Sequence, residues 1–230
     1  GSFNETRKRF EFYNKSTIQF QYLERDSDCD RIQGTEIHIA LIDEANSKDP
    51  NQEYFADKVW PKERLYSERM TQMLNRFKPD ADELMHIAVR AQHIKRWCSP
   101  RSHFPMDKQG YHQWRSALYV FHASTVVELM QQAGCSDVDQ QRVYAAVAKK
   151  KIKRNPDSQL VEDIASLVFI EYYMLAFVQT KPDYDEQKWI GILQRTWQKM
   201  STEAHDFVLA GNITLPAPLV PLIEKALAPS

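Results

Sequence analysis

Glycine is scarce in this chain, at 6 of 230 residues. Glycine supplies the backbone conformations that tight turns and nucleotide-binding loops need, so all-β folds and glycine-rich phosphate loops normally contain more of it. Hydrophobic residues make up 43% of the chain and charged residues 27%, which is ordinary for a protein that fills a core. The sequence therefore predicts an all-α fold.

Apolar residues recur at helical spacing from Thr35 onward. We predict one bundle-like domain of about seven or eight helices over residues 35–230. Ser136 and the stretch Asp80-Ala81-Asp82-Glu83 are typical helix starts, and Gly134 is a typical helix end. The expected helices cover about 36–47, 62–77, 81–98, 111–133, 137–151, 158–180 and 185–209, with a short last helix after the prolines at 216, 218 and 221.

The first 34 residues differ from the rest of the chain. Aromatic and aliphatic residues alternate with polar ones over 9–24, around Asn14-Lys15, and a period of two favours strands. We expect an N-terminal extension, 1–34, with a short β-hairpin that is either an appendage or an edge that pairs with a partner chain. Gly1-Ser2 is interpreted as a scar of tag removal.

Charge, cysteines and hydropathy restrict the class of protein. The net charge is −1, and Cys29, Cys98 and Cys135 show no paired spacing. A nucleic-acid coat protein usually has a basic excess, and unpaired cysteines are typical of reduced thiols. No apolar run approaches the roughly 20 residues of a membrane span, and no signal peptide is visible. We expect a cytoplasmic protein without a membrane partner, and the oligomeric state is left open.

The predicted helix 158–180 carries acidic residues beside its apolar stripe. On a helical wheel Glu171 falls within the stripe, Asp163 lies on its flank, and Glu162 points the opposite way, toward solvent. An ionised carboxylate that is buried without a partner costs several kcal/mol. Glu171 and Asp163 should therefore have a metal ion, an Arg, a Lys or a His as a partner. A structural salt bridge from Glu171 to Arg90 or Arg115 is an alternative to a functional role.

Two other predicted helices offer such partners. In 81–98 a stripe of His86, Arg90, His93 and Trp97 runs beside the apolar stripe, with Arg96 adjacent. In 111–133, Arg115 and His122 border the apolar face. If these helices face 158–180, the ionisable side chains form a polar pocket in the bundle, which is how bundles build metal and cofactor sites. The run Lys149 to Arg154 is interpreted either as a solvated helix end or as a phosphate contact.

Common catalytic signatures are absent from the sequence. It contains no Walker loop, no G-x-G-x-x-G, no H-E-x-x-H, no G-x-S-x-G and no C-x-x-C. Two helices with an E-x-x-H pair, which a ferritin-like di-iron site requires, are also absent.

Several stretches together resemble the domain of unknown function 4202 family, over roughly residues 37–228. They are Ile42 to Asn46, Asp49 to Asn51, Tyr66 to Met70, Arg90 to Trp97, Trp114-Arg115, His122-Ala123, Glu162 to Phe169, Glu171 and Thr196 to Ser201. The resemblance implies no activity. Its motif positions include His93, His122, Asp163 and Glu171.

The leading hypothesis is a hydrolase with a fold loosely similar to the HD-type phosphohydrolases, acting on a phosphate-containing, nucleotide-like substrate. In this hypothesis His93, His122 and Asp163 bind a divalent metal ion that activates water. Glu171 and Asp163 are the predicted catalytic residues, and Arg90, Arg96 and Arg115 bind the substrate phosphate. The adjacent His-Asp pair of that class is replaced here by His122-Ala123.

Two alternatives remain open. The first is a metal-free module in which the same three arginines and the run Lys149 to Arg154 bind a nucleotide or an RNA end, with Glu171 holding the arginines. The second is a structural adaptor that uses the hairpin Phe10 to Tyr22 for strand addition.

Overall fold

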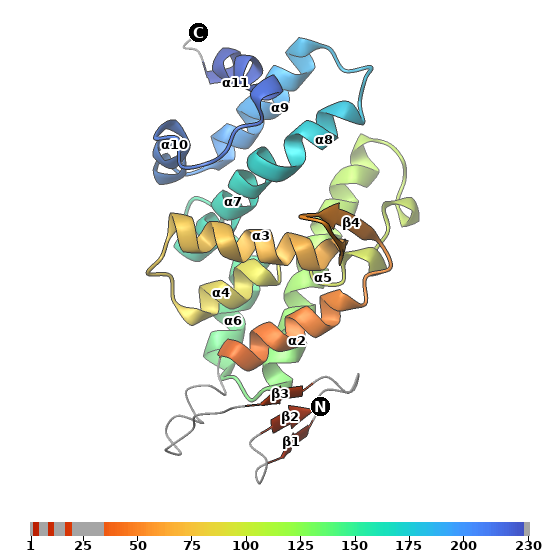
Figure 1. The fold of residues 1–230 in the computed structure, drawn as a ribbon, viewed down its shortest axis with the longest axis vertical. Coiled ribbons are helices and arrows are strands. Elements are labelled where there is room, and N and C mark those ends of the chain that lie inside the picture. The colour runs from red at the N-terminus through yellow and green to blue at the C-terminus, as the bar shows by residue number, and fades with distance from the viewer. Residues whose placement is uncertain (1, 5–8, 12–16, 20–34, 228–230) are drawn as a thin grey trace.

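The computed structural model describes residues 2–4, 9–11, 17–19 and 35–227. Its fold is all-α, as predicted, with short antiparallel strands near the N-terminus (Figure 1). Strands β1 (Ser2–Asn4), β2 (Arg9–Glu11) and β3 (Thr17–Gln19) form a sheet in that order, in which Phe10 pairs with Ile18. The predicted hairpin is thereby confirmed, while its parts at 12–16 and 20–24 lie outside the described residues.

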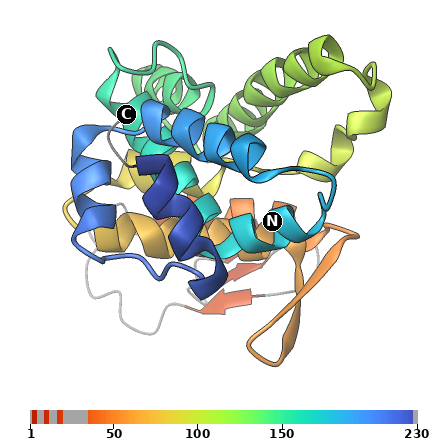
Figure 2. The ribbon, with the colours of Figure 1, turned by 90° about the horizontal axis from the view of Figure 1, so that it is seen from above.

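Helices α2 (Thr35–Ser47) and α3 (Lys62–Phe77) agree closely with the predicted ranges 36–47 and 62–77. Between them lies a hairpin that was not predicted, β4 (Gln52–Phe55) with β5 (Lys58–Pro61). Its turn residues Ala56 and Asp57 both have positive φ, 48° and 59°, as in the tight turns that suit hairpin twist. The usual Asn-Gly or Asp-Gly signal is absent here. Figure 2 shows this hairpin projecting from the helices.

The predicted helix 81–98 is correct only in its first half. Helix α4 (Glu83–Arg90) starts at its N-cap Asp82, whose side chain accepts from the backbone N–H of Met85, and it ends at Arg90. The chain then turns through Lys95, which has a φ of 50°, into a short 3₁₀ turn (Arg96–Cys98). The backbone N–H of Lys95 donates to Asn46 of α2. Contacts with neighbouring helices therefore override the local helical pattern, and the predicted stripe does not continue past Arg90.

Helix α5 (Lys108–Gln132) ends, and helix α6 (Asp137–Val147) begins, close to the predicted positions 133 and 137. Gly134 has a φ of 81°, which suits a helix-ending glycine, and Ser136 caps α6. Helix α6 ends before 151, because Lys149, Lys151 and Lys153 take positive φ values of 51°, 55° and 76°.

The predicted helix 158–180 is one rod with an irregular middle. Helix α7 (Pro156–Val168) runs through a π-helical turn (Phe169–Tyr173) into α8 (Met174–Gln179), as Figure 1 shows. A π-turn adds a residue to the repeat and rotates everything beyond it, so wheel positions in and after the turn differ from the ideal. Turns of this kind are frequent at functional sites.

The predicted helix 185–209 is two helices. Helix α9 (Glu186–Lys199) stops at Met200, and Ser201 caps α10 (Thr202–Leu209). The extended backbone at the break donates the N–H of Ser201 to Asp163 Oδ1 at 2.8 Å. After a 3₁₀ turn (Ala217–Leu219), α11 (Val220–Leu227) is the predicted last helix.

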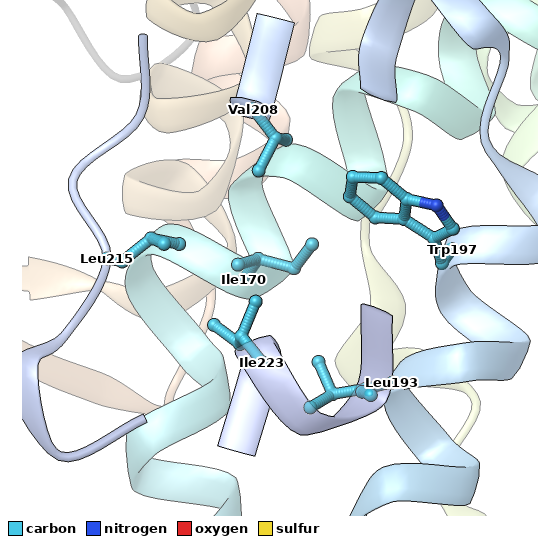
Figure 3. Close-up of a pocket in the computed structure, with 7 residues that line it drawn as sticks. Ile170, Leu193, Trp197, Val208, Leu215 and Ile223 are labelled. Atoms are coloured by element: carbon cyan, nitrogen blue, oxygen red, sulfur yellow. The ribbon is translucent and has the colours of Figure 1, made fainter. Parts of the chain in front are cut away.

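The C-terminal helices close over α7 and the π-turn (Figures 1 and 2). Their shared core contains a small apolar cavity of about 10 Å³, bordered by Ile170, Leu193, Trp197 and Val208 among others (Figure 3). It is too small and too apolar to hold a ligand. Among the described residues, no helix is both long and apolar enough to cross a membrane.

Candidate functional site

Ionisable and aromatic side chains from five segments meet where α3 packs against α7 and the turn after α4 packs against α5. Figure 1 shows the course of these helices. We name this group the His93–His122 cluster. Its members are Glu63 and Tyr66 of α3, His93 and Arg96 of the turn after α4, Arg115, Tyr119 and His122 of α5, Lys149 after α6, and Glu162 of α7.

His93 is held on both ring nitrogens. Its Nδ1 lies 3.2 Å from Glu63 Oε2, and its Nε2 lies 2.9 Å from Nη1 of Arg96. A guanidinium can only donate, so Nε2 accepts and the neutral ring carries its proton on Nδ1, which donates to Glu63. Burial, followed by the nearby cations Arg96 and Lys149, places the His93 pKa well below its ordinary value. The ring also stacks on Tyr66, with ring centroids 3.8 Å apart.

His122 is almost completely buried, with 1% of its surface exposed. Its Nδ1 lies 2.8 Å from the carbonyl oxygen of Ile94, which can only accept. The neutral ring therefore has its proton on Nδ1 and an open lone pair on Nε2. Within the described parts of the chain, that Nε2 has no hydrogen-bond partner. Burial and the proximity of His93 lower the pKa of His122 to about 3.

Arg96 and Arg115 contribute positive charge without a carboxylate partner in the described structure. Arg96 contacts His93 and stacks over the Trp114 ring at 5.0 Å. Arg115 donates to the hydroxyls of Tyr119, at 2.6 Å, and Tyr111, at 3.4 Å. Both side chains are only partly exposed. Partly buried arginines normally pair with an anion, so these two are suited to an anion that comes from outside the chain.

The predicted position of Glu162 on the solvent side of its helix was wrong. It was expected to face solvent, but it is 6% exposed and its carboxylate lies 2.5 Å from Lys149 Nζ. Burial alone would raise the pKa of Glu162, but Lys149 and the more distant Lys199 and Arg115 bring it below its ordinary value. The positive φ of Lys149 turns the chain as α6 ends. Lys149, which the sequence placed either at a solvated helix end or in a phosphate contact, thus enters the cluster.

Arg90, a predicted phosphate ligand, is engaged elsewhere. Its guanidinium donates to both oxygens of Asp43, at 2.7 and 2.8 Å, to Glu68 at 2.5 Å and to Thr71. The side chain is 5% exposed. This network joins α2, α3 and α4 and leaves the guanidinium with two carboxylates already bound.

Glu171, predicted to be catalytic, forms an ion pair with Arg76 of α3, and the distance between the nearest atoms is 3.0 Å. Its side chain is only 7% exposed, so the expectation that it needs a partner is correct, but the partner is neither Arg90 nor Arg115. Arg76 also donates to the backbone carbonyl of Asn212. The pair therefore connects α3, the π-turn and the C-terminal segment.

Asp163, predicted as both catalytic residue and metal ligand, is 2% exposed and accepts from the N–H of Ser201 and from Gln159 Nε2, each at 2.8 Å. Burial raises its pKa, and its hydrogen bonds with Ser201 oppose that rise. His93 and His122 do lie together, with ring centroids 5.9 Å apart. In the described residues, no group of three or more His, Cys, Asp or Glu side chains is arranged to hold a metal ion. A divalent metal stays a prediction.

The predicted site lacked Glu63, Tyr66, Tyr119 and Glu162, and it included Lys149 only within the run Lys149 to Arg154 of the metal-free alternative. For Glu63 and Tyr66 a signal existed, since Tyr66 opens one of the motif stretches and Glu63 lies one helical turn before it. For Lys149 and Glu162 only the contact between two segments reveals the role.

A family model described as "Domain of unknown function (DUF4202)" matches residues 36–223. This confirms the resemblance that the motifs suggested. Comparisons with curated proteins and with solved structures give no match.

Proposed function

The chain belongs to the domain of unknown function 4202 family, and we propose that its His93–His122 cluster binds and hydrolyses a phosphate monoester of a small molecule. Two observations together carry the proposal. The guanidinium groups of Arg96 and Arg115 form no ion pair with a carboxylate in the described structure, and the buried Nε2 of His122 has an open lone pair. Phosphate needs cationic donors, and hydrolysis needs an acceptor for the proton of water.

Positive charge dominates the open side of the cluster. Lys149 and Glu162 neutralise each other at 2.5 Å, and Glu63 is shared with the neutral His93, while burial raises the Glu63 pKa. Arg96 and Arg115 form no ion pair in the described cluster, although Glu63 interacts electrostatically with Arg96 and Glu162 with Arg115, so three cations face two carboxylates. His93 has 23% of its side chain exposed, so an anion can reach this side from solvent. A phosphate group would accept from the two guanidiniums next to His93.

His122 suits the acceptor role. The centroid of its ring lies 5.9 Å from that of His93, and the bond to Ile94 fixes the tautomer. In the free protein its low pKa makes it a weak base. A bound phosphate dianion offsets the cations and raises the pKa of a nearby imidazole. Binding would thus make His122 a better acceptor for a proton of the attacking water.

A pH dependence of binding follows from this coupling. If a bound dianion raises the pKa values of His93 and His122, the complex holds more protons than the free protein, and affinity increases as the pH falls. Calorimetric titrations in buffers of different ionisation enthalpy would detect this proton uptake.

The test of the proposal is release of inorganic phosphate from a panel of monoesters that includes ribose 5-phosphate and nucleoside monophosphates. His122→Asn keeps a donor for the Ile94 carbonyl and removes the open lone pair. We expect release by the wild type, and binding without release by His122→Asn. Undiminished release by that variant, or no binding of any monoester by the wild type, would overturn the proposal.

A further inference from the structure

A second feature lies outside the His93–His122 cluster. An open depression of about 450 Å³ lies between the turn after α6, the start of α7 and the break between α9 and α10. This volume falls within the usual range of small-molecule sites. Its wall includes Lys153, Arg154, Gln159, Gln198, Thr202 and His205.

The charge of this depression is positive. Two of the residues that line it, Lys153 and Arg154, are cations, and no Asp or Glu lines it. Arg154 is exposed and forms no ion pair within the described chain. Lys153 Nζ donates to the carbonyl of Met200 at 2.9 Å, which leaves its other two N–H groups available.

Carboxylates on the neighbouring segments are engaged elsewhere. Asp157, on the first turn of α7, binds Arg142 at 2.8 and 3.0 Å. Glu203, on the first turn of α10, contacts Lys78 at 3.2 Å. Asp163 accepts from Ser201 and Gln159. None of these three acids forms an ion pair with Arg154 in the described structure, while Asp163 interacts electrostatically with Lys153.

The backbone of the preceding turn is strained. Lys149, Lys151 and Lys153 all take left-handed φ values, which are unfavourable for residues that carry a Cβ atom. The Ser158 hydroxyl lies 3.0 Å from the carbonyl of Ala145 and 2.9 Å from that of Lys150, and these contacts hold the turn in place. The result is that Lys149 enters the cluster while Lys153 and Arg154 border the depression.

We propose that this depression is a second anion site, separate from the His93–His122 cluster, that binds the phosphate group of a phosphate ester. Arg154 and Lys153 neutralise the charge, and the hydroxyl of Thr202 with the amide of Gln198 supply neutral donors from the same lining. The same chemistry would recognise a free sugar phosphate or the terminal phosphate of an RNA.

The experiment is an amide NMR titration of the full chain with ribose 5-phosphate, and in parallel with a 5′-phosphorylated single-stranded RNA hexamer. We expect shift changes at 153–159 and 198–205 that persist in Arg115→Gln, which disables the cluster. Arg154→Gln should raise the dissociation constant for these shifts about tenfold. Lys181→Gln, an exposed loop lysine, should leave it unchanged.

The outcomes of this titration distinguish between the sources of the phosphate and test whether the second site exists. Tighter binding of the RNA than of ribose 5-phosphate at these residues identifies nucleic acid as the source of the phosphate, and equal or weaker binding identifies a small ester. Shifts confined to residues around His93 and Arg115 would overturn the second site and leave the proposed function standing. An unchanged dissociation constant in Arg154→Gln would also overturn it.

Discussion

The Nδ1 atom of His122 lies 2.8 Å from the carbonyl oxygen of Ile94. This bond joins the middle of α5 to the turn that follows α4, and Ile94 belongs to the segment where the predicted helix fails. It also fixes which ring nitrogen of His122 carries the proton. One contact thus links the irregular backbone after Arg90 to the chemical state of the cluster.

The burial of His122 should make the free energy of unfolding depend on pH. Its folded-state pKa, about 3, lies below the ordinary value of 6.5, so between these values the unfolded chain binds a proton that the folded chain does not. The free energy of unfolding should fall with decreasing pH over this window, by about 1.4 kcal/mol per pH unit for this group. His122→Asn should reduce that slope in urea titrations. The exposed His112, changed to Asn, is the control, and an equal slope in wild type and His122→Asn would contradict the assignment.

Lys149→Met should be strongly destabilising, because it leaves Glu162 buried and charged. Removal of one partner of a buried ion pair typically costs about 3–5 kcal/mol. The double variant Lys149→Met, Glu162→Gln should recover part of this loss, since no charge is then buried alone. Chemical denaturation of both single variants and the double variant gives the coupling energy. Strictly additive effects would mean that the two side chains do not interact.

Asp163→Asn should lower stability and leave the cluster chemistry intact. The carboxylate accepts from Ser201 and Gln159, and a weakened charge-assisted hydrogen bond costs about 1–3 kcal/mol. We expect a lower midpoint of thermal unfolding, with unchanged affinity for ribose 5-phosphate. If a folded Asp163→Asn protein no longer bound ribose 5-phosphate, Asp163 would belong to the ligand-binding site, contrary to this prediction.

Elemental analysis of the untagged protein by plasma mass spectrometry tests the role of metal. Asp163 makes its hydrogen bonds with Ser201 and Gln159, and the His93 Nε2 faces Arg96. We therefore expect far less than one metal ion per chain after purification and after incubation with divalent ions. Near-stoichiometric metal in the wild type that is lost in both His93→Ala and Asp163→Ala would contradict this expectation and support the predicted metal centre.

The sequence predicted those helices and helix ends that depend on local residue patterns. Helix α3 matches its predicted range, Gly134 and Ser136 cap as expected, and the N-cap of α4 is Asp82, two residues after the start of the predicted capping box at 80–83. Such signals act within one turn of the chain, so no neighbouring segment is needed to read them.

The candidate site was predicted only in part, because contacts between segments determine the rest. The structure brings His93 into contact with His122 and Arg96, with Arg115 close enough to affect the pKa of His93. A helical wheel shows the face on which Arg90 and Glu171 lie, but it does not show their ion-pair partners. Arg90 pairs with Asp43, and Glu171, which lies in the π-turn, pairs with Arg76. Glu162 appeared solvated because nothing in the sequence shows that Lys149 turns inward at a positive φ.

Calorimetric titration of ribose 5-phosphate at about pH 7 tests the central claim most directly. The wild type should bind in the His93–His122 cluster, and Arg115→Gln should weaken that binding at least about tenfold, as expected for one lost charge-assisted contact. Arg115→Gln must also keep the unfolding midpoint close to that of the wild type. Equal affinity of wild type and Arg115→Gln in a fully folded protein would show that the unpaired arginines of the cluster do not bind phosphate.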